Sequence, residues 1–252
     1  LGLDVSNLPT ALVSNTLDYG KFEILETTEF MKSTLSIWDE LGFSFDAVYV
    51  GFLFSHEQSA LVQEYCTRES KRGIPVFFDP IMGDWGHLYN GVSEEDVAYR
   101  RNMCSVADVI MPNMTEAQYI CGKHIGEESI SKEDAHDLVE GLRALGASNI
   151  VITSACIDGV HCTLVAEKGT DDPAYLYYDE VPIQMPGTGD IFASSLMGAY
   201  LQGSPLVESV RFAMRVVSCL LSMCLGSADC LKGIPVESFL GELSLEELMS
   251  VE

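Results

Sequence analysis

Residues 184–195 read QMPGTGDIFASS, a glycine-rich turn that leads into a helical pattern and carries a carboxylate where the helix begins. A helix N-terminus has unpaired backbone N–H groups and a partial positive charge. Gly187 and Gly189 would let a phosphate approach that backbone closely. Asp190 would repel a phosphate, so we interpret it as a base that takes a proton from a hydroxyl attacking the phosphorus atom. The alternative is an ordinary turn in which Asp190 caps the helix.

The composition describes an acidic globular chain. Its 252 residues are 47% apolar, and 14 basic against 38 acidic side chains give a formal net charge of −24. This charge argues against nucleic-acid partners and anionic membranes, and a polyphosphate ligand would need a metal ion and backbone dipoles to neutralise it. No apolar run is long enough to span a bilayer. Eight cysteines without a C-x-x-C pair predict reduced thiols in a cytoplasmic protein.

Apolar runs of strand length alternate with helical patterns. Strands are expected at residues 11–14, 47–50, 75–78, 109–111, 150–153 and 161–166, and near 175–182. Helices are expected at residues 29–41, 57–72, 94–105, 116–121, 132–145, 190–201 and 206–225, with an acidic surface helix over 235–252. This order predicts a single α/β domain over residues 1–252, with a mainly parallel central sheet that binds ligands beyond the carboxyl ends of its strands.

Carboxylates follow the strand expected at residues 75–78. The loop of residues 79–84, DPIMGD, supplies Asp79 and Asp84. A hard cation beside phosphates prefers such oxygen ligands, often through water. The alternative is a polar turn without a ligand.

Two further strand ends carry polar side chains. Asn113 and Glu116 have the spacing of a helix cap, and Glu116 would otherwise bind a metal-water shell or orient phosphates. Thr153 and Ser154 could donate hydroxyl hydrogen bonds to phosphate, or simply end a strand. Residues 15–22, NTLDYGKF, mix aromatic and hydroxyl groups that would suit an aromatic small molecule.

Taken together, these motifs resemble those of the pyridoxal kinases in the ribokinase-like superfamily. The resemblance covers most of the chain and rests on residues 14–16, 19–22, 79–84, 112–113, 116, 153–154 and 187–190. It implies a three-layer sandwich with helices on both faces of the sheet. It also implies ATP-dependent phosphorylation of the 5′-hydroxymethyl group of a vitamin B6 vitamer by a homodimer.

The resemblance also implies roles for individual residues. Asp190 would be the catalytic base, and the backbone N–H groups of Gly187, Thr188 and Gly189 would form an anion hole for the moving phosphoryl group. Asp84 would serve Mg²⁺, directly or through water.

Other residues would surround the ligands. Asp79 would help hold a monovalent cation such as K⁺, or the phosphate region. ATP would contact Asn113, Thr153 and Ser154, with Glu116 serving both ATP and Mg²⁺. The residues expected around the vitamer ring are Thr16, Tyr19, Phe52 and Tyr89.

Three departures from the family pattern bear on these expectations. Phe52 stands where relatives often have a ring-contacting tyrosine, and Met111 where some have a threonine near the monovalent cation. The relatives begin with a strand and a Ser/Gly loop that contacts substrate, whereas the given sequence starts at Leu1, after the position expected for that segment. Two other functions stay open. One is a hydroxymethylpyrimidine kinase, although those relatives often carry cysteine at the position of Asp190. The other is a paralogue that binds the vitamer without turnover.

Overall fold

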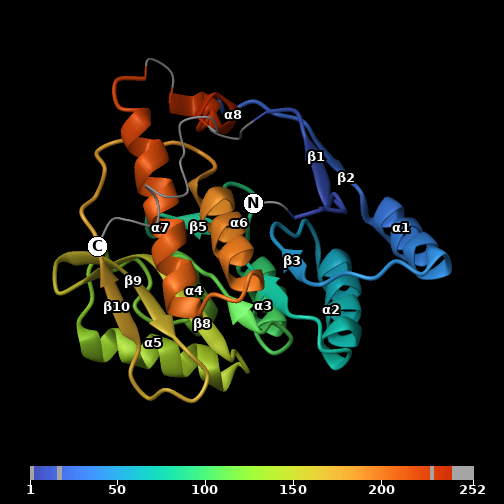
Figure 1. Cartoon of the computed structure of the whole chain (residues 1–252), viewed down its shortest axis with the longest axis horizontal. Coiled ribbons are helices and arrows are strands. Elements are labelled where there is room, and N and C mark those ends of the chain that lie inside the picture. Colours follow the sequence, from blue (N-terminus) through green and yellow to red (C-terminus); the bar gives the residue numbers. More distant parts are fainter. Residues whose placement is uncertain (1–2, 16–18, 228–229, 240–252) are drawn as a thin grey trace. The chain divides into compact units, whose positions relative to one another are not determined.

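The central element is a sheet of six strands, seen in the computed structural model of the chain (Figure 1), which describes residues 3–15, 19–227 and 230–239. The strand order is β10-β9-β8-β7-β4-β3. The strands are β3 (Val48–Val50), β4 (Val76–Phe78), β7 (Val109–Ile110), β8 (Asn149–Ile157), β9 (Val160–Ala166) and β10 (Ala174–Tyr177). The first four are parallel, and β9 and β10 are antiparallel to their neighbours. The predicted mainly parallel sheet is therefore confirmed.

Four helices connect these strands and pack side by side in chain order. They are α2 (His56–Lys71), α3 (Glu94–Met103), α4 (Met114–Cys121) and α5 (Lys132–Ala144). Because the chain moves along the sheet in one direction from β3 to β8, right-handed crossovers place all four helices on the same face. Each begins at a residue whose side chain accepts a backbone N–H of the first turn, namely Ser55, Ser93, Asn113 and Ser131.

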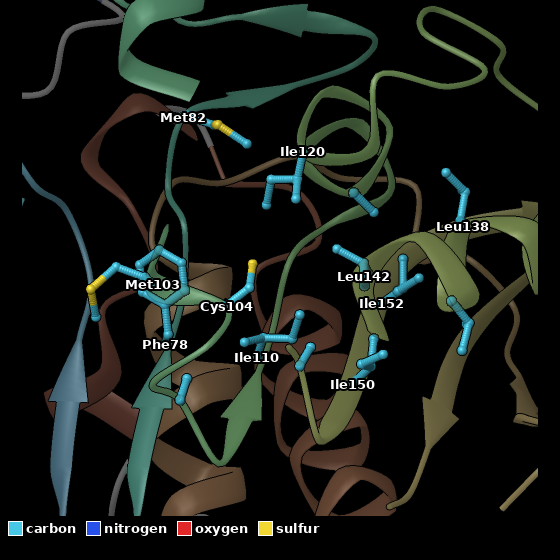
Figure 2. Close-up of a cluster of buried hydrophobic side chains, with 14 of the residues drawn as sticks. Phe78, Met82, Met103, Cys104, Ile110, Ile120, Leu138, Leu142, Ile150 and Ile152 are labelled. Carbon is cyan, nitrogen blue, oxygen red and sulfur yellow. The ribbon is translucent and has the colours of Figure 1, made fainter. Parts of the chain in front are cut away.

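The core lies between this sheet and these helices. Val76, Phe77 and Phe78 are all buried, as expected for a strand covered on both faces. Figure 2 shows side chains of β4, β7 and β8 facing those of the helices, including Phe78, Ile110, Ile150, Ile152, Met103, Ile120, Leu138 and Leu142.

By the proximity of their Cα atoms, the residues form two units. One unit, Ser6–Leu12 with Leu25–Tyr178, contains the sheet. The other combines Leu1–Val5, Val13–Ile24 and Asp179–Glu252. It contains α6 (Thr188–Leu201), α7 (Leu206–Met223), a 3₁₀ turn (Cys230–Lys232) and α8 (Val236–Phe239), with an apolar cluster formed by Ile191, Phe212, Val216, Cys219, Leu220, Ile234 and Phe239.

The remaining elements are short. β1 (Ala11–Val13) and β2 (Ile24–Glu26) form a two-stranded sheet, which α1 (Thr28–Leu41) follows. β5 (Gly83–Asp84) and β6 (His87–Leu88) form a hairpin. The sequence did not predict β2, β5 or β6, which lie outside the apolar runs of strand length from which the other strands were predicted.

Two predicted strand boundaries were wrong. β10 ends at Tyr177 instead of continuing toward residue 182, and β8 extends to Ile157 instead of ending at residue 153. Of the surface helix expected over 235–252, the structure shows only α8, and residues 240–252 lie outside the described residues. None of the helices in the described part of the chain is both long and apolar enough to cross a membrane.

Candidate functional site

The glycine-rich turn ends where α6 begins. Gly187 is the N-cap, with a left-handed φ of 94° that favours glycine. No side chain of the described residues caps this helix. A Cβ atom placed on Gly187 or Gly189 would meet no described heavy atom within 4 Å. No described atom crowds the Cβ positions of these two glycines, which leaves room for an anion to approach the start of α6.

Asp190 is the third residue of α6. The alternative prediction, that Asp190 caps the helix, is not supported. Gly187 occupies the N-cap position, and the carboxylate of Asp190 makes no capping bond. The residue is exposed at the helix surface, yet nearby atoms desolvate its carboxylate enough to raise its pKa. A raised pKa makes the carboxylate a better proton acceptor once it is ionised.

The acidic loop, residues 79–84, follows β4. Asp79 is buried, and the Tyr49 hydroxyl donates to its Oδ2 at 3.3 Å. Asp84 stands in the β5–β6 hairpin, whose two turn residues, Trp85 and Gly86, have φ values of 53° and 77°. Positive φ at both positions is the mark of a type I′ hairpin turn. Asp84 accepts the Trp85 N–H at 2.8 Å, and burial raises its pKa.

Glu116 joins this loop to the start of α4. It is buried, with Oε1 accepting the Met82 N–H at 2.9 Å and Oε2 accepting the Asn113 N–H at 2.8 Å. Asn113 completes the predicted capping box by accepting the Glu116 N–H at 2.9 Å, and its amide donates to the Gly83 carbonyl at 2.8 Å. The cap is confirmed, and it also fixes the acidic loop.

The electrostatics of this cluster favour a cation. Burial, followed by the negative charge of Asp79, raises the pKa of Glu116 to about 8. Within residues 3–15, 19–227 and 230–239, no group of three or more His, Cys, Asp or Glu side chains is arranged to hold a metal ion. By themselves, Asp79, Asp84 and Glu116 are therefore not arranged as a metal site. Carboxylates can still contribute to magnesium binding through the ion's water shell where phosphate oxygens supply its direct ligands.

Gly83 permits the close approach of the two hairpin strands. A Cβ atom at this position would lie 2.4 Å from the His87 carbonyl oxygen, which is backbone and cannot rotate away. We expect Gly83→Ala to lower stability by about 1–3 kcal/mol, as overpacking does in rigid sites, measured by urea unfolding. Gly189→Ala is the control, because its Cβ would meet open space. Equal stability of the two variants would contradict the close-approach argument.

The candidate phosphate-contacting residues lie on neighbouring strands. Asn113 follows β7, whereas Thr153 and Ser154 lie inside β8 and not at the strand end that the sequence predicted. Asn113 and Thr153 are bridged as a parallel pair, and the Thr153 N–H donates to the Pro112 carbonyl at 3.0 Å. The register of β8 against β9 shifts between Ile152 and Ala155, and Ser154 takes a positive φ of 53°. Such bulges re-aim side chains, and they are frequent beside active sites.

The residues expected around the vitamer are spread over several segments. Phe52 follows β3 and is half-buried, with its ring edge-on to Phe54 at a centroid distance of 6.5 Å. Tyr89 follows the hairpin, where its N–H donates to the Met82 carbonyl at 2.9 Å. Tyr19 is exposed and belongs to the same unit as Asp190, and Thr16 lies outside the described residues.

The profile of the phosphomethylpyrimidine kinase family matches residues 5–228. The chain belongs to this family. Among curated relatives, a pyridoxal kinase of Arabidopsis thaliana is 35% identical over 125 residues, which cover 48% of this chain and 38% of the relative. A hydroxymethylpyrimidine/phosphomethylpyrimidine kinase of Aquifex aeolicus is 25% identical over 177 residues, covering 68% of this chain and 65% of the relative. The chain thus spans less than two thirds of each of these relatives.

Solved structures of the same family share the fold. A Bacteroides thetaiotaomicron protein classed as a phosphomethylpyrimidine kinase, crystallised with pyridoxal, matches with a TM-score of 0.86 at 28% identity, over 93% of this chain and 83% of its own. A Leishmania donovani pyridoxal kinase in complex with ADP and pyridoxamine matches with a TM-score of 0.81 at 25% identity, over 96% of this chain and 86% of its own. The predicted ribokinase-like α/β fold and the resemblance to pyridoxal kinases are confirmed.

The sequence missed several residues that hold this family member's site together. Tyr49 binds Asp79 through its hydroxyl, and the Thr115 hydroxyl accepts the Gly86 N–H at 2.8 Å. Tyr49 occupies the middle of an expected strand and Thr115 the start of a helix, where both residue types are ordinary. Only the fold reveals these contacts, because each joins segments about 30 residues apart.

Proposed function

We propose that this protein is an ATP-dependent kinase that phosphorylates the 5′-hydroxymethyl group of a vitamin B6 vitamer, namely pyridoxal, pyridoxine or pyridoxamine. The observation that carries the proposal is the start of α6, where an exposed carboxylate with a raised pKa stands beside an open, uncapped helix N-terminus. Phosphoryl transfer needs positioning and charge stabilisation more than covalent chemistry, and this turn offers both a base and an anion hole.

Each residue group has a part in this reaction. The hydroxymethyl oxygen attacks the γ-phosphorus atom of ATP while Asp190 accepts the hydroxyl proton, and ADP leaves as the bond between the γ-phosphorus and the β,γ-bridging oxygen breaks. The N–H groups of Thr188 and Gly189 stabilise the negative charge of the moving phosphoryl group. Bound Mg²⁺ would supply charge neutralisation of the phosphates. Asp84 and Glu116 would hold the water shell of this ion. Asp79 would help to hold either a monovalent cation such as K⁺ or the phosphates.

The choice of a B6 vitamer rests on the similarity to pyridoxal kinases and to a relative crystallised with pyridoxal. Phe52 can stack on the pyridine ring but has no hydroxyl to donate, and Tyr89 follows the hairpin that carries Asp84. ATP is proposed because a similar pyridoxal kinase binds ADP. The eight free thiols suit the reducing cytoplasm.

A second candidate is the phosphorylation of hydroxymethylpyrimidine. The family description and the Aquifex aeolicus relative favour it. The acceptor is again a hydroxymethyl group on an aromatic ring, so Asp190 would have the same task.

One assay separates these candidates. The purified protein is incubated with Mg²⁺-ATP and, in turn, with pyridoxal, pyridoxine, pyridoxamine and hydroxymethylpyrimidine, and ADP formation is followed. Turnover of the B6 vitamers alone supports the proposal, and turnover of the pyrimidine alone overturns it in favour of the second candidate. Vitamer binding without turnover would indicate a non-catalytic paralogue.

We also propose a homodimer, formed through the outer face of α1. Phe30, Thr34, Ile37 and Leu41 recur with helical spacing, and the three apolar members are 55%, 50% and 67% exposed. The groove between α1 and the β1–β2 sheet continues this surface with Leu12 and Leu25. Exposed apolar surface of this kind favours association.

Local charge pairing makes self-association of so acidic a chain feasible. Lys32 lies 2.6 Å from both Glu29 and Glu57, and Arg68 lies 2.7 Å from Asp39. The two cations offset two of these three carboxylates around the α1 face, which reduces the local repulsion between two copies.

We expect Ile37→Glu to convert the dimer to a monomer, because a carboxylate would have to be buried without a partner. Size-exclusion chromatography with light scattering measures the mass. Ser36→Glu, on the polar side of the same helix, should remain dimeric. A wild type that is monomeric at every concentration would contradict the homodimer.

A further inference from the structure

Arg100 is a buried arginine whose hydrogen-bonding capacity is fully used by neutral oxygens. It lies on α3 and is 1% exposed. A guanidinium has five N–H donors in a rigid planar fork, and here five acceptors meet them. They are the carbonyls of Pro80 at 2.7 Å, Asp96 at 3.1 Å, Leu53 at 3.0 Å and Ile81 at 3.3 Å, and the Tyr99 hydroxyl at 2.7 Å.

Burying a charge in this way is costly, and none of these five acceptors is a carboxylate that would offset the cost. A methionine or leucine would fill the same space without desolvating a charge. The side chain therefore calls for an explanation beyond core packing. The identity of its partners supplies one.

Three of the acceptors belong to the two loops that carry site residues. Leu53 lies in the loop after β3, directly beside Phe52. Pro80 and Ile81 lie in the acidic loop after β4, directly after Asp79. β3 and β4 are adjacent parallel strands, so both loops leave the same edge of the sheet. One guanidinium thus bonds the backbones of both loops.

Other side chains hold the first loop in the same way. The Thr10 hydroxyl donates to the Phe52 carbonyl at 2.8 Å, and the Phe54 N–H donates to Gln58 Oε1 at 3.0 Å. The Tyr99 hydroxyl donates to the Leu53 carbonyl at 3.3 Å. Side chains fix this loop where strand pairing has ended, and Arg100 alone among these side chains also reaches the acidic loop.

We propose that Arg100 is a positioning residue that sets the separation between the Phe52 loop and the acidic loop. This inference rests on the proposed function, in which the first loop contacts the acceptor ring and the second serves the phosphates. Arg100 touches neither substrate. It fixes the distance between the Phe52 loop, which contacts the acceptor, and the acidic loop, which serves the phosphates. Small displacements between reacting groups lower the reaction rate strongly.

The test compares Arg100→Lys with Arg101→Lys. Lysine keeps the charge but has three donors and no planar fork. Arg101 is a matched control on the same helix, because it donates to the Ile120 and Tyr119 carbonyls at 2.6 and 2.8 Å, at the end of α4 and away from both loops. Steady-state kinetics are measured below the melting transition, with circular dichroism confirming the fold.

We expect Arg100→Lys to raise the KM for the acceptor about tenfold and to lower kcat by up to about 10²-fold, as a misplaced substrate does. Arg101→Lys should lose thermal stability while keeping both constants within about twofold. A folded Arg100→Lys with wild-type constants would overturn the proposal, as would an equal kinetic change in Arg101→Lys.

Tyr99→Phe decides the matter if Arg100→Lys does not fold. This variant keeps the ring and removes only the hydroxyl that bridges Arg100 and the Leu53 carbonyl. We therefore expect a smaller rise in the acceptor KM than in Arg100→Lys. An unchanged KM and kcat would overturn the proposal. The acceptor used is whichever the wild type turns over. If that is the pyrimidine, the B6 function fails while the positioning role is still tested.

Discussion

Replacing Asp190 by asparagine is expected to lower kcat by about 10²–10⁴-fold, the usual contribution of a general base, while ATP and vitamer still bind. The amide has nearly the same shape as the carboxylate but cannot accept the hydroxyl proton. The fold should survive, because Asp190 makes no capping bond in α6. Initial rates and equilibrium binding of a non-hydrolysable ATP analogue measure the two effects separately.

Glu208→Gln is the matched control for this variant. Glu208 also lies in the first turn of a helix, α7, and it pairs with Arg211 at 3.7 Å on the surface. Its replacement should leave kcat unchanged. Full activity of Asp190→Asn would exclude Asp190 as the base and return it to a structural role.

Replacing Glu116 by glutamine is expected to raise the Mg²⁺ concentration for half-maximal rate by about 10–100-fold, the usual effect of losing a group that orients the ligands of a metal. It should also cost about 1–3 kcal/mol of stability. Both carboxylate oxygens accept a backbone N–H, from Met82 and Asn113, and the amide nitrogen of glutamine would face one of these donors. Magnesium titrations at saturating ATP and urea unfolding measure the two effects.

Asp134→Asn is the control, because Asp134 completes the same kind of capping box at the start of α5 but does not reach the acidic loop. It should lose some stability and keep the wild-type magnesium titration. An unchanged titration in Glu116→Gln would leave Glu116 as a helix cap alone.

The same variant tests the electrostatics of Glu116. Its pKa is about 8, against an ordinary value of 4.5, so the folded state binds a proton that the unfolded chain releases. Stability therefore falls as the pH rises between these two values. Glutamine has no proton to lose, so the pH dependence of Glu116→Gln should be flatter from pH 5 to 8.5 in metal-free buffer. Parallel curves for the two proteins would contradict the raised pKa.

Much of the fold could be predicted from the sequence, because buried parallel strands and amphipathic helices leave strong local patterns. Val76–Phe78 is continuously apolar, and the residues placed at strand ends, Asp79 and Asn113, do follow β4 and β7. The β5–β6 hairpin could not be predicted in this way. Its strands have two residues each, and a tryptophan with positive φ stands in its turn.

Site residues could be predicted from the sequence where they also form a local structural motif. Asn113 and Glu116 have the spacing of a capping box, and the structure confirms that cap. The bond from Met82 to Glu116 and the contacts of Arg100 could not be inferred, since they join segments about 20 to 50 residues apart. The sequence Arg100-Arg101 gives no sign that the first arginine binds two loops and the second a helix end.

The division of the chain into two units has a consequence for its synthesis. The unit that carries Asp190 draws residues from both ends of the chain, whereas the sheet unit is complete once Tyr178 has been made. Domains fold as they leave the ribosome, N-terminal parts first. A nascent chain that stops before residue 190 therefore already contains every strand of the sheet and the carboxylates of the acidic loop, but not Asp190, the proposed base. Under the proposed function, such a chain would carry the groups that serve cation and nucleotide but could not transfer a phosphoryl group.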